Sequence, residues 1–400
     1  MHTIADTKML VEEGVISQAA ARIIEARART TMVALAINTV LCAGIVFATF
    51  GLIFWLANAF AVAICGILMA GAGLLTLRFG RPLYAMFGNA AALIGCGMLL
   101  GGMAFELSDK LPEMAGWILA AVGGVVAVGA GFSFLRGQLT TPFVTGAVML
   151  MGGALHLFGL GFLLKDLALQ GAPIVAFWLY SAAVLAGLGA LTDIRLISAL
   201  AIAPFAQALD TGTFYFHAAY VFYSPEATLS ILQMAGLAAG MLWLAHNSTE
   251  RTARHARIHV MMAFIVANLC ALVGSLWGDV VGQTIWGPGV RYWRNGMSYD
   301  EWRAAMDAFE ATALVIHEHF YSVLWALALA ATAFVAAHRN QRGLFNAAIT
   351  FAGIHGYTQM FETFYDEPLA YVIGGLAAVP LAWGMWRLNT WFLAQRQTLA

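Results

Sequence analysis

Histidines and acidic side chains gather in two apolar segments near the C-terminus. Segments 308–337 and 344–364 contain Glu310, His317, Glu318, His319, His355, Gln359 and Glu362. Imidazole is the commonest metal ligand in proteins, and its neutral form is tolerated where the dielectric constant is low. Ionisable groups inside a membrane are costly unless they are paired or solvated, so each of them is a candidate for function. The cluster therefore indicates a metal site or a path for protons.

Helical spacing divides these side chains into faces. At about 100° per residue, Glu310 and His317 share one face of segment 308–337. His355, Gln359 and Glu362 share one face of segment 344–364. His317 and His319 are predicted to point to nearly opposite sides of one helix. They therefore suit two separate centres, or one centre and a hydrogen bond, better than a single metal. The alternative is that each histidine only hydrogen-bonds a neighbouring helix.

Other histidines lie outside this cluster. His156 is a lone histidine of segment 141–164, among small residues that permit close approach of a helix or a flat cofactor. His217 follows segment 194–212 in a region rich in tyrosine, which is a usual anchor at the membrane interface. Four histidines stand among arginines and are predicted to be solvated: His246, His255, His259 and His338.

The elements that must position these residues are membrane helices. Of 400 residues, 61% are hydrophobic and 10% are charged, which leaves too few charges to cover a water-facing globule. A spanning helix needs about 20 apolar residues, and apolar runs follow one another from Thr31 onward. The net charge of -1 offers no basic stripe for a nucleic acid.

The predicted fold is an all-α polytopic bundle of about twelve transmembrane helices. The predicted spans lie near 31–57, 59–78, 82–104, 114–134, 141–164, 172–191, 194–212, 226–246, 258–282, 308–337, 344–364 and 369–392. Residues 1–30 are predicted to form a cytoplasmic amphipathic helical hairpin that breaks at Gly14. Residues 31–400 are predicted to form a single transmembrane domain with an outer loop at 283–307.

The distribution of arginine predicts the orientation. Alternate connections carry Arg78, Arg136, Arg195, Arg254 and Arg339, whereas the other connections are mainly acidic. By the positive-inside rule, the arginine-rich connections and both termini lie in the cytoplasm. The His and Glu cluster then lies in the outer half of the bilayer.

One motif resembles a known family. Leu314-Val-Ile-His-Glu-His-Phe-Tyr-Ser-Val-Leu324 is similar to the tenth helix of the catalytic subunit in the haem-copper oxidase and nitric oxide reductase superfamily. The resemblance implies that His317 binds an active-site haem and His319 an electron-transfer haem. The sequence departs from that family at Thr213 and Phe214, where the adjacent histidines for a second metal are absent.

A second, shorter resemblance concerns the N-terminal hairpin. Its Gly14-Val-Ile-Ser17 turn is similar to the opening of a group of multi-helix bacterial membrane proteins of unknown function. With the arginine pattern, this resemblance predicts a multi-pass protein of the bacterial inner membrane.

The leading hypothesis is a membrane-embedded protein that binds haem or a transition metal and carries out redox chemistry. The candidate metal ligands are His317, His319 and His355. The candidate catalytic residues are Glu310, Glu318, Gln359 and Glu362, and the candidate cofactor-binding residues are His156, His217 and Tyr321. Expected partners are the lipid bilayer and another membrane subunit or an electron donor. The alternatives are a proton-coupled transporter or channel that uses the same His and Glu residues as a relay, and an accessory subunit without a cofactor.

Overall fold

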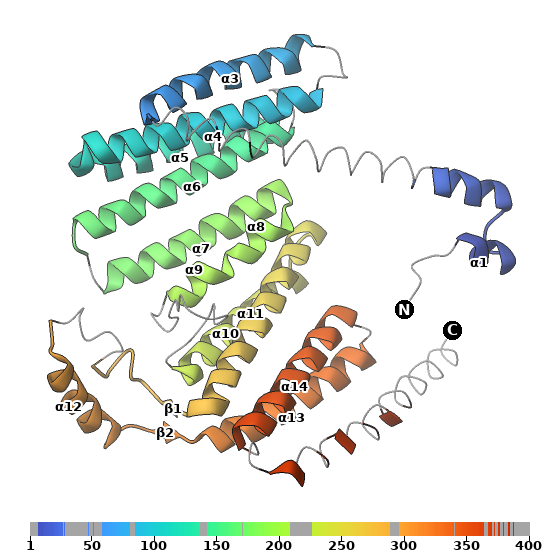
Figure 1. The fold of residues 1–400 in the computed structure, drawn as a ribbon, viewed down its shortest axis with the longest axis vertical. Helices are drawn as coiled ribbons and strands as arrows, with labels where there is room; N and C mark the ends of the chain where they lie inside the picture. Colours follow the sequence, from blue (N-terminus) through green and yellow to red (C-terminus); the bar gives the residue numbers. More distant parts are fainter. Residues whose placement is uncertain are drawn as a thin grey trace. The chain divides into compact units, whose positions relative to one another are not determined.

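The structure is a computed structural model whose described part is almost entirely helical (Figure 1). It describes residues 7–26, 58–80, 85–136, 142–169, 171–208, 226–288, 296–339 and 341–363, together with isolated residues elsewhere. The elements are α1 (Thr7–Glu12), α3 (Ala59–Phe79), α4 (Ala85–Lys110), α5 (Pro112–Arg136), α6 (Pro142–Asp166), α7 (Ala172–Thr192), α8 (Arg195–Leu200), α9 (Ile202–Gln207), α10 (Ala227–His246), α11 (Glu250–Trp277), β1 (Asp279–Val280), α12 (Tyr299–Glu310), β2 (Val315–Ile316), α13 (Glu318–His338) and α14 (Arg342–Thr363).

Eight of the described helices are long and apolar enough to cross a membrane. They are α3, α4, α5, α6, α7, α10, α11 and α13. The prediction of a polytopic all-α membrane protein is thus confirmed. The predicted number of twelve spans is corrected to eight in the described part of the chain.

The four other predicted spans have different outcomes. Spans 31–57 and 369–392 fall mainly on residues outside the described ranges. Helix α14 forms where 344–364 was predicted, but its polar residues keep it out of the set of apolar spans. The predicted span 194–212 begins as two short helices, α8 and α9, separated at Ala201.

The predicted helix 308–337 is wrong at its N-terminal part. Helix α12 ends at Glu310, strand β2 follows, and α13 begins only at Glu318. Helix α12 starts in a capping box in which Ser298 Oγ accepts the Glu301 N–H and Glu301 Oε2 accepts the Ser298 N–H. Hydrogen bonds that the Ser298 N–H and the Ser298 hydroxyl donate to the Glu301 carboxyl hold its pKa below its usual range. Val315 and Ile316, directly before His317, form strand β2, and periodicity alone cannot distinguish such a short apolar run from a helix.

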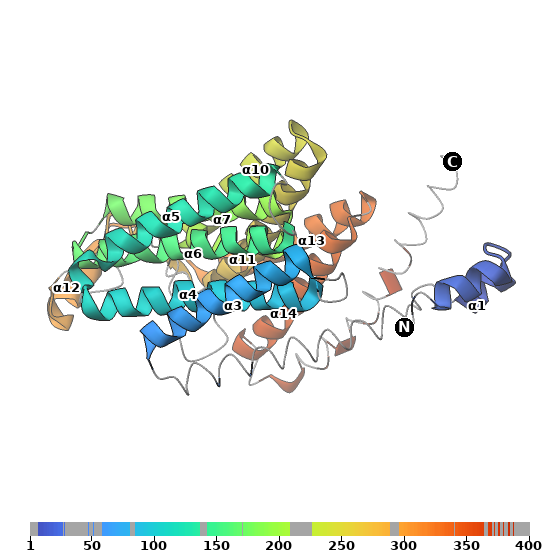
Figure 2. The ribbon, with the colours of Figure 1, turned by 90° about the horizontal axis from the view of Figure 1, so that it is seen from above.

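The chain forms two compact units, residues 1–162 and residues 163–400. In the first unit, α3 packs along α4 (Figures 1 and 2) through small residues. A Cβ atom added to Gly73 would lie 2.3 Å from the backbone nitrogen of Ala92, and one added to Gly95 would lie 2.2 Å from that of Ala70. The backbones therefore approach closely, as small residues allow in membrane helices.

Residues 7–26 of the first unit contain α1, a turn and a second helical stretch, 18–26. Gly14 in the turn has φ +70°, which glycine adopts without strain. Ser17 Oγ accepts the Ala20 N–H, and Thr7 Oγ1 donates to Glu25 Oε1 at 2.7 Å, so the two arms contact each other. The position of this hairpin at the cytoplasmic face stays a prediction.

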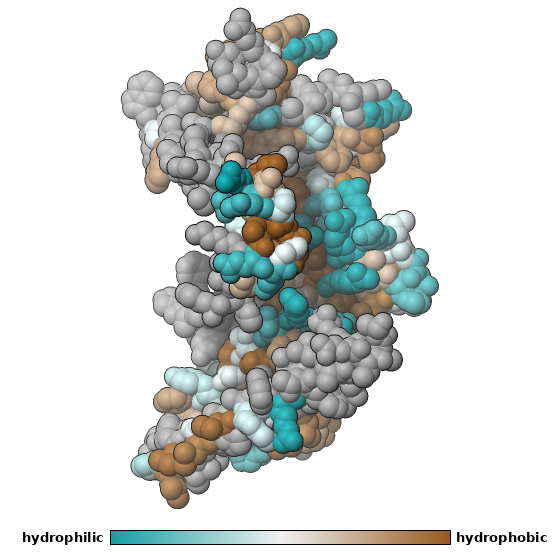
Figure 3. Space-filling view, turned by 90° about the vertical axis from the view of Figure 1, so that its right-hand side faces the viewer, coloured by the Kyte–Doolittle hydropathy of each residue, from teal (hydrophilic) through white to brown (hydrophobic). Residues whose placement is uncertain are grey.

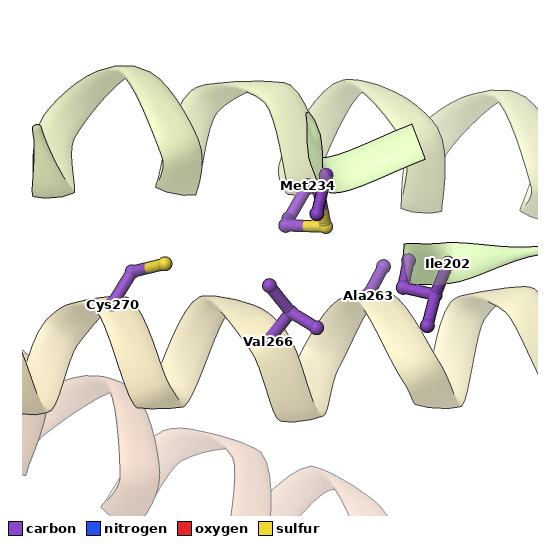
Figure 4. Close-up of a cluster of buried hydrophobic side chains, with 6 residues drawn as sticks. Ile202, Met234, Ala263, Val266 and Cys270 are labelled. Atoms are coloured by element: carbon purple, nitrogen blue, oxygen red, sulfur yellow. The ribbon is translucent and has the colours of Figure 1, made fainter. Parts of the chain in front are cut away.

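Helix α11 packs against α10, α13 and α8 in the second unit (Figure 1). A core cluster of Ile202, Met234, Ala263, Val266 and Cys270 joins α9, α10 and α11 (Figure 4). Many apolar side chains of the spans remain exposed, and brown apolar atoms lie beside teal polar atoms at the surface in Figure 3. A lipid bilayer is the solvent that such side chains require.

Candidate metal centre

A short β-ladder connects the end of α11 to the start of α13. Asp279 pairs with Ile316 and Val280 with Val315, in antiparallel register. Gly278 precedes the ladder with φ +68°, and a Cβ atom there would lie 2.6 Å from the carbonyl oxygen of Ile316. Glycine therefore allows both the turn out of α11 and the close approach of β2.

His317 is the N-cap of α13 and does not belong to the helix itself. Its backbone is extended, at φ −69° and ψ 147°, and its Nδ1 accepts the His319 N–H at 3.4 Å. The centroids of the His317 and His319 rings lie 4.8 Å apart. The prediction that these rings point to opposite sides of one helix is wrong, because the helix begins one residue after His317.

His317, Glu318 and His319 form a group that could hold a metal ion. Each offers one ligand atom, and these atoms all lie within 4.8 Å of one another. His317 Nδ1 and Glu318 Oε2 are 3.2 Å apart. Two ligand atoms bound at about 2.1 Å to one tetrahedral ion lie ~3.4 Å apart, which is close to the spacing of this pair. An ion bound to His317 Nδ1 would replace the long hydrogen bond from the His319 N–H, because a ring nitrogen has a single lone pair.

Tyr321 lies one turn further along α13 and is buried. Its hydroxyl donates to Asp279 Oδ2 at 3.1 Å and lies 2.5 Å from Thr228 Oγ1. Thr228, at the start of α10, donates to the same Asp279 oxygen from its N–H at 2.8 Å and from its hydroxyl. The predicted cofactor-binding residue Tyr321 therefore belongs to a polar cluster that also contains Asp279.

Glu226 is a second buried carboxylate near β1, at the N-cap of α10. Its Oε1 accepts the Gly282 N–H, and its Oε2 accepts the Thr284 N–H at 2.9 Å and the Thr284 hydroxyl. These bonds tie the turn that follows β1 to the start of α10. Sequence analysis did not single out Asp279, which it placed inside the apolar helix 258–282. An ionisable residue in an apolar run was the available signal.

The structure does not bring His355 into the group at the start of α13. The His355 ring packs edge-on against Trp325, with centroids 4.7 Å apart. Trp325 lies seven residues after Glu318, which corresponds to ~10 Å along a helix. Gln359 lies half-buried on α14 and Glu310 is exposed at the end of α12. The Glu362 side chain and His217 lie outside the described residues.

His156 connects two helices of the first unit. Its Nδ1 lies 2.7 Å from the carbonyl oxygen of Ala120, which can only accept, so Nδ1 donates. A Cβ atom added to Gly123 would lie 2.3 Å from the His156 backbone nitrogen. The small residues around His156 thus serve close packing of α5 against α6. A cofactor at His156 stays a prediction.

Two histidines that were predicted to be solvated are buried. His255 is 2% exposed and His259 is 7% exposed. His255 Nε2 donates to Asp193 Oδ1 at 2.9 Å, and its Nδ1 lies 2.7 Å from Ser198 Oγ. The bond from His255 is the main cause that lowers the pKa of the Asp193 carboxyl, and Arg254 and Arg251 add to it. The contact joins the end of α7 and the start of α8 to α11.

Comparison of the chain with models of known protein families, with curated proteins and with solved structures finds no match. The resemblance of residues 314–324 to haem-copper oxidases and nitric oxide reductases stays a prediction carried by those residues. The local structure differs from what that resemblance implies in one respect. Its two haem-ligating histidines would face opposite sides of a helix, whereas the His317 and His319 rings lie side by side.

Proposed function

We propose that this protein is a membrane-embedded metalloprotein whose centre lies at the start of α13. The observation that carries the proposal is the group of His317, Glu318 and His319, whose ligand atoms lie within 4.8 Å of one another. Two imidazoles and one carboxylate form a ligand set that suits first-row transition metals. Most of the His317 side chain is exposed, so the centre is open at one side.

This arrangement fits a single ion better than two haems. Rings with centroids 4.8 Å apart leave no room for a separate macrocycle on each histidine. The β1–β2 ladder and Gly278 fix the backbone just before His317, which limits how far the ligands can move. An ion held by three protein ligands keeps open positions for water or a small molecule, and a redox-active metal would supply electron transfer there.

The test is the metal content of the purified full-length chain, freed of any affinity tag and supplied in turn with zinc, copper, iron and manganese salts. We expect about one transition-metal ion per chain in the wild type after removal of loosely bound metal. His317→Ala and His319→Ala should each weaken metal binding by at least about 10-fold. Loss of a residue that only hydrogen-bonds a metal ligand already weakens binding by about that much, and loss of the ligand itself should weaken it more.

His355→Ala is the matched control, because it removes a histidine of the neighbouring helix that packs against Trp325. It should retain the metal. Equal metal content in wild type, His317→Ala and His319→Ala would contradict the proposed centre. A wild type that binds no metal stoichiometrically would leave the proton relay or the accessory subunit as the better explanation of the cluster.

A further inference from the structure

A groove in the first unit lies between α3 and the pair formed by α5 and α6. Its volume is about 520 Å³, and residues of all three helices line it. Leu75 of α3 and Val125 of α5, two of the lining residues, are 61% and 73% exposed, so the groove is open at one side. The three helices are candidate membrane spans. In a bilayer, such an apolar groove is filled by hydrocarbon and not by water.

Gly129 of α5 keeps part of the groove open. A Cβ atom added to Gly129 would meet nothing within 4 Å, whereas one added to Gly152 of α6 would lie 2.6 Å from the backbone nitrogen of Ala127. Gly152 therefore allows α5 and α6 to pack closely, and Gly129 does not serve that contact. The space beside Gly129 belongs to the groove, because Gly129 is one of its lining residues. A larger side chain at position 129 would occupy this space.

The groove is polar at one end and apolar along the rest of its length. Helices α3 and α5 end, and α6 begins, at the same side of the first unit (Figure 1). Arg78, Ser133 and Thr145 line the groove at that end, and Val125 and other apolar residues line it further along. The segment from Val125 to Ser133 corresponds to ~12 Å of helix, compared with ~15 Å for the hydrocarbon core of one leaflet. The groove therefore extends through most of one leaflet.

Arg78 gives the polar end of the groove a positive charge. It is the one charged residue among the described residues that line the groove. Its guanidinium carbon lies 5.7 Å from the centroid of the Phe79 ring, and it forms no ion pair with a described residue. The side chain is exposed in the last turn of α3. An apolar groove with a positive end complements a molecule that has a hydrocarbon chain and a negatively charged head.

We propose that this groove is a binding site for an anionic glycerophospholipid. The phosphate of the headgroup binds at Arg78, and one acyl chain runs along the groove past Gly129. Basic pockets between membrane helices bind the headgroups of anionic lipids. All residues of the site belong to the first unit, so the proposal does not depend on the metal centre at the start of α13.

The first test is native mass spectrometry of the full-length protein, released from detergent and titrated with phosphatidylglycerol or with zwitterionic phosphatidylcholine of the same acyl chains. The wild type should bind one phosphatidylglycerol more tightly than phosphatidylcholine. Arg78→Gln should weaken phosphatidylglycerol binding by about 5-fold, which is the contribution of one arginine near an anionic membrane surface. Arg136→Gln is the matched control, because this exposed arginine at the end of α5 does not line the groove. It should bind phosphatidylglycerol as the wild type does.

The second test concerns the acyl chain. Gly129→Phe should reduce the binding of both lipids, because its ring occupies the groove. Gly71→Phe is the matched control, because a Cβ atom there also meets nothing within 4 Å and Gly71 of α3 does not line the groove. It should bind both lipids as the wild type does. Inorganic phosphate should not displace phosphatidylglycerol, because a free anion has no acyl chain to place in the groove.

Equal affinity of the wild type for the two lipids would overturn the proposal, and so would equal phosphatidylglycerol binding by Arg78→Gln and Arg136→Gln. Equal lipid binding by Gly129→Phe and Gly71→Phe would place the acyl chain elsewhere on the protein. Displacement of phosphatidylglycerol by inorganic phosphate would identify a site for a free anion in place of a lipid.

Discussion

The histidines of this chain differ in what their ring nitrogens contact. His156 donates to a helix carbonyl, His255 lies between Ser198 and Asp193, and His355 packs against Trp325. In the described part of the chain, His317, Glu318 and His319 are the group of three side chains whose ligand atoms could hold a metal ion. Residue type and spacing made His156, His317, His319 and His355 candidates, whereas His255 was predicted to be solvated. The partners of His156, His255 and His355 are remote in sequence, so they could not be read from local pattern.

Asp193 should give the protein a measurable sensitivity to acid. Its folded-state pKa is lowered, mainly by the hydrogen bond from His255, so its stabilising contribution is present above the unfolded pKa of about 3.9. That contribution is lost as the pH falls from about 4 through the lower folded-state pKa. Asp193→Asn should therefore melt below the wild type at pH 7, and the difference should shrink toward pH 3.

His255→Gln is the matched variant, because it removes the main partner of Asp193 while leaving the carboxylate in place. It should show the same reduced acid sensitivity, and the double variant should add little to either single change. Thermal melting of the purified variants across this pH range provides the measurement. A difference between wild type and Asp193→Asn that is the same at pH 3 and pH 7 would refute this linkage.

Helix ends and close helix contacts decide how the elements are placed. The cap of α13 at His317 and the ladder at Gly278 explain why the two histidines come together. The apolar spans themselves could be predicted from the sequence, since an apolar run of about 20 residues fits few structures other than a membrane-spanning helix. The start of α13 could not, because the apolar run 311–316 fits a helix and an extended segment equally well. Pairing with β1, a contact remote in sequence, decides between them.

Two glycines of α3 provide a test of close helix packing. A Cβ atom at Gly73 would lie 2.3 Å from the Ala92 nitrogen of α4, whereas one at Gly71 meets nothing within 4 Å. Gly73→Ala and Gly71→Ala gain the same helix propensity, so their difference isolates the packing. Gly73→Ala should be less stable than Gly71→Ala by about 1–3 kcal/mol in reversible chemical unfolding. Equal stability would show that α3 and α4 are not held this closely.

Along the chain, the connections between successive helices are alternately rich in arginine and rich in acidic residues. Helix α11 runs from Arg254 toward Gly278, and α13 returns toward Arg339, with α12 at the opposite ends of both (Figure 1). This path agrees with the predicted alternation, while the orientation itself stays a prediction. The interrupted stretch α8–α9 was predicted as one helix. Near the end of α9, the Phe205 carbonyl accepts hydrogen bonds from Gln233 Nε2 of α10 and from the Ala208 N–H.

Reporter fusions test the orientation directly. A reporter joined after Arg254 or Arg339 should be cytoplasmic, and one placed at Asn295 should be exported, because arginine-rich connections are retained inside. The paired use of an enzyme active only in the cytoplasm and one active only after export provides the measurement. An exported reporter at Arg254 would reverse the assignment and place the His317 group at the cytoplasmic side.

Because β1 and β2 pair with each other, the two ends of the segment between them lie next to each other in space. Val281 and Leu314, at the two ends of this segment, are themselves joined by a backbone hydrogen bond of 3.0 Å. Extra length added near the exposed Glu310 therefore changes loop entropy only slightly and does not separate α11 from α13. This place is suited to a grafted tag or a fluorescent domain, which would sit a few residues from His317 and give the centre an optical label.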